Sequence, residues 1–273
     1  MRGLVAAVAA ILALSGCASP ADPQNSTTAV PGTASVTESR APLTSSAVAS
    51  PAAICAAPVV ALDPGHNPVR IESFDPKTGV AQIDYPNGAE DADAYSVASQ
   101  VATILRARGY RVVLLKRSLS ESVSYRQRVD RAEKARAAIG ISIHTSPGVN
   151  AVFPQRIGLY REGTGAGGTT RRVTFRTTGT AASSQRFAVI IAGARSRAEG
   201  HRVPVQDNDF GGRSPLWSGN IPIISLLAQN TPWVYNEFSP GEAGGSVAVA
   251  ATALRTYARG IAEGISAALP RHC

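Results

Sequence analysis

The stretch VVALDPGHNP, residues 59–68, runs from four apolar residues directly into a turn. A short apolar run bounded by turn residues predicts a buried strand, here Val59–Leu62. Asp63, Pro64 and Gly65 are residue types that favour a tight turn, so the strand ends by presenting His66. A strand that is apolar on both faces is typical of a parallel sheet covered by helices on both sides.

The rest of the folded part alternates short apolar runs with helical periodicity. Apolar residues at helical spacing, from Ala94 to Leu105, predict a helix over Glu90–Arg108 that ends at Gly109. Further strands are expected at Val112–Leu115, Ile139–His144, Ile157–Tyr160 and Trp233–Glu237, further helices at Tyr125–Ala138, Ser184–Glu199 and Ser246–Leu269, a short helix or turn at Ile223–Gln229, and loops at 67–89 and 200–220. This order predicts one α/β domain over residues 58–273, with a twisted, mostly parallel sheet and helices on both faces.

The composition restricts the class of partner. The chain has 273 residues, 27 Lys and Arg against 19 Asp and Glu, and a net charge of +8. A basic surface suits an acidic polymer such as a cell wall, an anionic membrane or nucleic acid. Because the basic residues are scattered, a solvated Arg-rich surface explains them, and we expect no nucleic-acid partner.

Residues 1–17, MRGLVAAVAAILALSGC, have the features of an export signal. Arg2 precedes an apolar run from Leu4 to Leu14 that is too short to span a bilayer as a mature helix. The ending Leu14-Ser15-Gly16-Cys17 resembles a bacterial lipobox, in which Cys17 is lipidated. Ordinary cleavage after Ala18 is the alternative. We expect a protein exported to the cell envelope, on the periplasmic face, and held at the membrane only through a lipid anchor at Cys17.

Residues 18–57 form a linker made mostly of Ser, Thr, Ala, Pro and Gly. Such a segment buries too little apolar surface to offset its ordering entropy, so we expect disorder. The two other cysteines, Cys55 and Cys273, stand at the two ends of the predicted domain. In an oxidising compartment this pair predicts a disulfide, and the alternative is two unpaired thiols at frayed ends.

Three predicted strands carry a polar residue at the carboxyl end, where ligands bind in open α/β sheets. These residues are His66, His144 and Glu237. Glu90 opens a helix on its apolar side and is the expected third ligand beside the two histidines. Two imidazoles and one carboxylate predict a zinc (Zn²⁺) site with an open position, as in hydrolytic zinc enzymes. Glu72, Asp75 and Asp84 are alternatives to Glu90, and two core histidines without a metal are the simpler interpretation.

Four motifs in this order resemble the zinc-dependent N-acetylmuramoyl-L-alanine amidases. They are VVALDPGHNP, Glu90 ahead of GYRVVLLKR, then ISIHTS, then VYNEFSP, and the resemblance covers residues 58–269. The signal peptide and the Ala/Arg-rich composition are most similar to mycobacterial members. The resemblance implies zinc held by His66, Glu90 and His144, and Glu237 as general base and acid. It also implies cleavage between the lactoyl group of N-acetylmuramic acid and L-alanine, in peptidoglycan or in muropeptide fragments.

The sequence departs from the family pattern at Asn67-Pro68, at Thr145-Ser146 and in EFSPGEAGG. These differences bear on substrate shape more than on chemistry. A non-catalytic peptidoglycan-binding lipoprotein and a zinc peptidase are the competing functions. We expect His201 to be an exposed loop residue, His272 to lie in an irrelevant tail, and the protein to be a monomer. The polar insert at 161–182, with Arg171, Arg172 and Arg176, is expected either to rim the cleft or to form a flexible hairpin.

Overall fold

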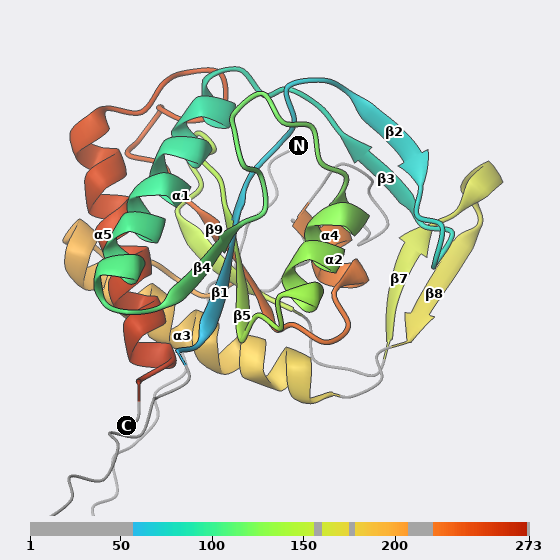
Figure 1. The fold of residues 1–273 in the computed structure, drawn as a ribbon. Coiled ribbons are helices and arrows are strands. Elements are labelled where there is room, and N and C mark those ends of the chain that lie inside the picture. The colour runs from blue at the N-terminus through green and yellow to red at the C-terminus, as the bar shows by residue number, and fades with distance from the viewer. Residues whose placement is uncertain (1–56, 156–159, 175–177, 207–220, 272–273) are drawn as a thin grey trace, which may run out of the picture. The chain divides into compact units, whose positions relative to one another are not determined.

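The computed structural model describes residues 57–155, 160–174, 178–206 and 221–271 (Figure 1). The predicted signal peptide, nearly all of the predicted linker, His272 and the three cysteines, Cys17, Cys55 and Cys273, lie outside the described residues, so what the sequence indicates for them stays a prediction. Within the described ranges, no helix combines the length and the apolar character needed to cross a membrane.

The central sheet has five strands in the order β4-β1-β5-β9-β6. Their bounds are Arg111–Leu114 for β4, Val59–Pro64 for β1, Ile139–Ile143 for β5, Trp233–Glu237 for β9 and Ala151–Pro154 for β6. The first four strands are parallel to one another, and β6 runs antiparallel to β9 at the edge. The predicted α/β class with a mostly parallel sheet is confirmed.

Helices cover both faces of this sheet (Figure 1). Helices α1 (Ala89–Ala107), α3 (Gly179–Glu199) and α5 (Ala251–Ala268) cover one face, and α2 (Tyr125–Lys134) and α4 (Ile221–Leu227) cover the other. Alternate residues of β1 point to opposite faces, so Val60 and Leu62 join the core under the first group. Val59 and Ala61 join the core under α2 and α4. This is why the strand is apolar at every position from Val59 to Leu62.

The predicted loop 67–89 contains a β-hairpin, and the prediction of an irregular loop is wrong there. Strands β2 (Ile71–Phe74) and β3 (Ala81–Asp84) pair antiparallel. The turn between them is closed by Asp75, whose carboxylate accepts hydrogen bonds from the backbone and hydroxyl of Thr78. Each strand has only four residues, so neither shows a clear alternating pattern in the sequence.

The polar insert forms a second hairpin, which was one of the two alternatives expected for it. Strands β7 (Tyr160–Thr164) and β8 (Thr170–Thr174) enclose a short 3₁₀ turn, η1 (Ala166–Gly168), within the polar insert. Of the predicted strand Ile157–Tyr160, only Tyr160 is described, and it begins β7. Strand β6 was not predicted because it is four residues long and ends in Pro154, a residue that a sheet tolerates at its edge.

Helix boundaries differ from the predictions by several residues. Helix α2 ends at Lys134 rather than Ala138, because Arg136 has a left-handed backbone with φ 52°. Helix α3 starts before the predicted Ser184, and α5 starts after the predicted Ser246. The predicted end of α3 is confirmed, since Gly200 caps it in the left-handed conformation at φ 77°.

Candidate metal centre and active site

Three neighbouring parallel strands end at the same edge of the sheet and bring the predicted side chains together. His66 follows β1, His144 follows β5, and Glu237 is the last residue of β9. Glu90 lies in the first turn of α1, and its side chain is fully buried. The site therefore forms from four segments that are far apart in the sequence.

His66, Glu90 and His144 form a compact group. One ligand atom from each lies within 4.8 Å of the others. Glu90 bridges the two rings, with Oε2 3.3 Å from Nε2 of His66 and Oε1 2.9 Å from Nδ1 of His144. The backbone N–H of Thr145 also donates to Oε1 at 3.0 Å, and the amide of Asn87 donates to Oε2. These contacts fix the carboxylate between the two imidazoles.

The turn before His66 requires a glycine and a strained histidine. A Cβ atom at Gly65 would overlap the ring of His144, so only glycine allows the two metal-competent histidines to approach each other. His66 itself has φ 58°, which is uncommon for a residue with a side chain. The backbone N–H of Gly65 donates to the carbonyl of Ile143 at 2.9 Å and ties the turn to β5.

Two buried cations hold this turn. Arg128 donates to the carboxylate of Asp63 at 2.6 Å, to the carbonyl of Pro64 at 2.8 Å and to the carbonyl of His66 at 2.6 Å. Lys116, which is fully buried, donates to the same carbonyl of His66 at 2.9 Å. Because both cations bind the carbonyl of His66, they oppose the strain of its left-handed backbone.

Asp84 lies behind His66 rather than in the three-residue group. Its Oδ1 is 3.3 Å from Nδ1 of His66, on the side of the ring away from Glu90. This position suits a carboxylate that orients the histidine, not a ligand that replaces Glu90. Glu72 is exposed and pairs with Arg70, and Asp75 pairs with Arg126, so neither of these carboxylates replaces Glu90.

The carboxylates of Asp84 and Glu90 favour positive charge on His66. Burial lowers the pKa of His66, but the carboxylates of Asp84 and Glu90 outweigh it and raise that pKa to about 10. Burial raises the pKa of Glu90, and the two histidines outweigh it and lower the pKa. Burial lowers the pKa of His144. Two ionised carboxylates beside buried imidazoles make a site that favours a bound cation.

Glu237 has one oxygen held and one oxygen free. The hydroxyl of Tyr235 donates to Oε1 at 3.1 Å, whereas Oε2 is buried with no hydrogen-bond partner among the described residues. Burial, followed by the charge of Glu90, raises the pKa of Glu237 to about 8. The ring of Tyr235 also stacks on His144, with centroids 4.3 Å apart. A carboxyl with a raised pKa and an unpaired oxygen is poised to accept and return a proton.

Sequence reasoning missed several residues of this site. Tyr235 and Asn87 carried no signal of their own, since an isolated tyrosine or asparagine is common in any strand or loop. Arg128 did carry a signal. It lies three residues after Tyr125 and four before Ala132, on the buried stripe of α2, where a charged residue needs a partner.

The remaining predicted residues lie outside the group. His201 is exposed, as expected, and contacts Asn150 and Glu199. The insert is a hairpin in which Arg172 donates to Glu162 at 3.2 Å, and Arg176 is not among the described residues.

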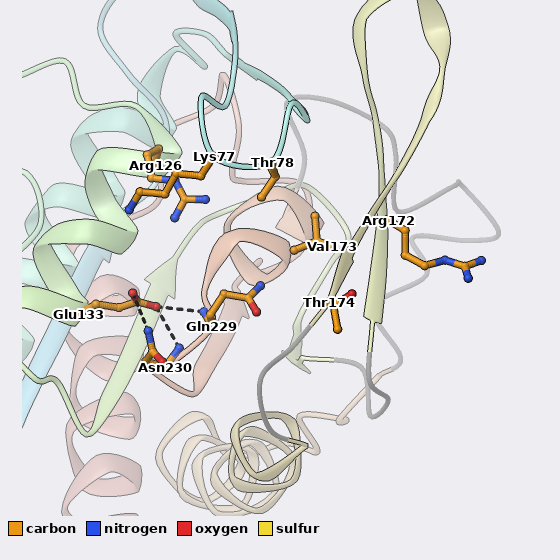
Figure 2. Close-up of a pocket in the computed structure, with 9 residues that line it drawn as sticks. All are labelled: Lys77, Thr78, Arg126, Glu133, Arg172, Val173, Thr174, Gln229 and Asn230. Atoms are coloured by element: carbon orange, nitrogen blue, oxygen red, sulfur yellow. Dashed lines mark hydrogen bonds between the residues drawn. The ribbon is translucent and has the colours of Figure 1, made fainter.

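Arg172 also lines a separate cavity of about 400 Å³, shown in Figure 2. The cavity is bounded by the turn after β2, helix α2, strand β8 and the segment after α4, and its lining is Lys77, Thr78, Arg126, Glu133, Arg172, Val173, Thr174, Gln229 and Asn230. Its charged side chains have local partners: Lys77 pairs with Asp130, and Glu133 accepts hydrogen bonds from Gln229 and Asn230 (Figure 2). It contains none of the four residues predicted for catalysis or metal binding.

The sequence matches the family described as N-acetylmuramoyl-L-alanine amidase, Amidase_3, over residues 60–219, more than half of the chain. The chain belongs to this family. It is an amidase of this enzyme class. The match includes His66, Glu90 and His144 and ends before Glu237. No curated protein matches the sequence.

Solved structures share the fold of this amidase. The N-acetylmuramyl-L-alanine amidase Ami1 from Mycobacterium abscessus, in its apo form, has a TM-score of 0.52 and 15% identity, with 77% of this chain and 98% of that chain covered. Ami1 from Mycobacterium smegmatis has a TM-score of 0.50 and 16% identity, with 78% and 97% covered. At such identities the likeness establishes the fold of the domain and no more.

Proposed function

We propose that this amidase uses zinc to hydrolyse the amide bond between the lactoyl group of N-acetylmuramic acid and L-alanine, in peptidoglycan or its muropeptide fragments. The observation that carries the proposal is the convergence of His66, Glu90 and His144 beside a buried Glu237 whose Oε2 is free. The family match supports the reaction class.

The residues present fit zinc. Two imidazoles and one carboxylate are its preferred donors in catalytic sites, where three protein ligands leave one position open. Nε2 of His66, Nδ1 of His144 and a carboxylate oxygen of Glu90 are the atoms that would hold it. Bound zinc supplies a Lewis acid that polarises the scissile carbonyl and lowers the pKa of water to about 7.

Glu237 moves the proton. Its free Oε2 takes a proton from the attacking water, and the same oxygen then protonates the departing nitrogen of L-alanine. Tyr235 holds Oε1 through its hydroxyl, so the carboxyl presents one fixed oxygen to the substrate. The raised pKa of Glu237 places it near neutrality, where it can both accept and donate.

Other residues orient the ligands. Asp84 faces Nδ1 of His66 and orients its ring, and Thr145 and Asn87 fix the carboxylate of Glu90. Arg128 and Lys116 hold the turn that carries His66. Partners of this kind affect metal affinity by about ten- to a hundredfold in known sites.

The test is mass spectrometry of muramyl dipeptide after incubation with the purified protein, with and without a chelator. We expect release of the free dipeptide, loss of release with the chelator, and recovery when zinc is added back. Release of peptide only from intact sacculi would support the same reaction, with polymeric peptidoglycan as the substrate. Zinc binding without release from either substrate would contradict the proposed reaction and favour the wall-binding function.

We also propose that the protein is an exported lipoprotein, lipidated at Cys17, that reaches peptidoglycan through its 18–57 linker and acts as a monomer without nucleic acid. The support is the order of signal, Cys17 and polar linker in the sequence. Mass spectrometry of the mature N-terminal peptide tests this, because a lipidated Cys17 adds the mass of its acyl chains and ordinary cleavage does not.

A further inference from the structure

Tyr85 places an exposed aromatic ring beside the metal-competent group. It directly follows β3, and its backbone N–H donates to Oδ1 of Asp84 at 3.0 Å. Its ring centroid lies 6.3 Å from that of His66, and the residue is 37% exposed. A large ring that stays open to solvent at this position is not needed to fill the core.

A row of contacts runs from Tyr85 to Glu237. After the 6.3 Å step to His66, the rings of His66 and His144 meet edge-on at 5.0 Å. The ring of His144 then stacks on Tyr235 at 4.3 Å, and the hydroxyl of Tyr235 reaches Glu237 at 3.1 Å. In this series of contacts Tyr85 adjoins His66 and Glu237 adjoins Tyr235, so the two residues meet the metal-competent group through different neighbours.

This order gives the substrate a direction, if the proposed function holds. Glu237 protonates the departing nitrogen, so the peptide half of the substrate lies at the Glu237 end. The acyl half, with its sugar, must extend the other way from the scissile carbonyl, toward His66 and Tyr85.

We propose that Tyr85 is the binding platform for the sugar half, with its ring packed against the C–H face of N-acetylmuramic acid. A pyranose ring presents aliphatic C–H groups on one face, and an aromatic ring has a negative face that attracts them. The phenol hydroxyl at the ring's edge stays compatible with water. The platform contributes binding shared by the ground state and the transition state, so it acts on KM rather than on kcat.

Two substrates isolate this contact: muramyl dipeptide, and its sugar-free counterpart lactoyl-L-alanyl-D-isoglutamine. For Tyr85→Ala we expect KM for muramyl dipeptide to rise about tenfold with kcat within about twofold. For the sugar-free substrate we expect no difference from the wild type. Tyr85→Phe keeps the ring and should behave as the wild type with both.

Phe74 provides a matched control. It lies on β2 of the same hairpin, is 51% exposed, and has no ring contact with the three-residue group among the described residues. Phe74→Ala removes a comparable exposed aromatic and should leave both KM values unchanged. The zinc content of each variant is measured first, because equal loading excludes an effect through His66.

A binding measurement separates this inference from the proposed function. Calorimetric titration of the zinc-loaded full chain with N-acetylmuramic acid should give a Kd about tenfold weaker for Tyr85→Ala. If neither substrate is cleaved but this difference in Kd appears, the proposed reaction fails and the platform stands. If turnover occurs and Tyr85→Ala changes neither the Kd nor the ratio of the two KM values, the platform is wrong. Absence of both turnover and sugar binding would overturn both.

Discussion

At the scale of single residues, His66 links backbone strain to function. Its left-handed φ of 58° costs on the order of 1 kcal/mol for a residue with a side chain. The two hydrogen bonds that Arg128 and Lys116 donate to its carbonyl offset this cost. The strained residue is the one whose ring must point into the group with Glu90 and His144, so the strain follows from the position that the site demands.

Substitutions at His66 and Glu237 should separate metal binding from proton transfer. His66→Ala removes a ligand, and zinc affinity should fall by more than about a hundredfold in a chelator competition. Glu237→Ala should keep zinc and lower kcat/KM about 10² to 10⁴-fold, because only the proton carrier is lost. Full activity in Glu237→Ala would show that another residue carries the proton.

Tyr235→Phe should lower kcat about tenfold while zinc affinity is kept. Phenylalanine preserves the stacking on His144 and removes only the hydrogen bond to Oε1 of Glu237. Because that bond lowers the pKa of Glu237, its loss should move the acidic limb of the kcat/KM profile to higher pH. Tyr95→Phe, which removes a surface hydrogen bond to Arg117, is the control and should leave the profile unchanged.

At the scale of elements, α2 and the β2–β3 hairpin support the site from one side. Arg128 of α2 reaches the turn after β1, and Arg126 of the same helix holds Asp75 at the hairpin turn. The hairpin in turn ends in Asp84, which contacts His66. Two arginines of α2 thus hold both the turn that carries His66 and the hairpin whose Asp84 contacts His66.

Arg128→Ala should destabilise the protein by about 3–5 kcal/mol, because it leaves Asp63 buried without its partner. The free energy of unfolding from urea titration measures this. Lys134→Ala, an exposed change on the same helix, is the control and should stay within about 0.5 kcal/mol. If Arg128→Ala does not fold, Arg128→Lys keeps a cation without the planar fork and should give a smaller loss. Equal stability of all three variants would contradict a stabilising role for the buried hydrogen bonds and ion pair of Arg128.

The Asp75–Arg126 pair should make stability depend on pH in the acid range. Burial raises the pKa of Asp75, but the hydrogen bonds from Arg126 and Thr78 and the charge of Arg126 together outweigh burial and lower the pKa below the unfolded value near 3.9. The pair therefore stabilises the fold above about pH 4, and this contribution is lost as the pH falls through the native pKa. Asp75→Asn should cost about 2 kcal/mol at pH 7, and the difference from the wild type should shrink as the pH falls below about 4 and vanish only below the native pKa. A difference that stays constant with pH would exclude the ion pair as its source.

At the scale of the whole molecule, the two ends of the described chain meet the same turn. The carbonyl of Pro58 accepts from the backbone N–H of Arg111 at 3.1 Å, and Arg271 donates to the carbonyl of Arg108 at 2.9 Å. Cys55 precedes the first of these residues by three positions, and Cys273 follows Arg271 by two. Both cysteines lie outside the described residues, so the disulfide between them stays a prediction from the sequence.

Cys273→Ser should destabilise the oxidised protein by up to about 4–5 kcal/mol, since the bridge would close a very long loop. The change in Tm is measured with and without reductant, and the wild type in reductant should match the variant. Alkylation followed by mass spectrometry counts the free thiols directly. Two free thiols per oxidised chain, beyond Cys17, would rule the bridge out.

Much of the architecture follows from local patterns in the sequence. Val59–Leu62 and Ile139–Ile143 are mostly apolar, Trp233–Glu237 begins with three apolar residues, and α1 and α5 have an apolar face. His66, His144 and Glu237 each end a predicted strand. They could be predicted to lie close together, because the carboxyl ends of parallel strands meet at one edge of the sheet. The hairpin β2–β3 could not be predicted, because its four-residue strands lie in a polar segment and have no distinctive period.

The fold class, the edge of the sheet where the site forms and the residue types that gather there follow from apolar periodicity and chain order, so they could be predicted from the sequence. The folded structure was needed to see that Asp84 orients His66, that Arg128 and Lys116 hold its turn, and that Tyr235 bonds one oxygen of Glu237 and leaves the other without a hydrogen bond. These assignments depend on contacts between residues up to 62 positions apart in the chain. Buried charges and hydrogen bonds take their roles from their neighbours in space, and no local pattern records those neighbours.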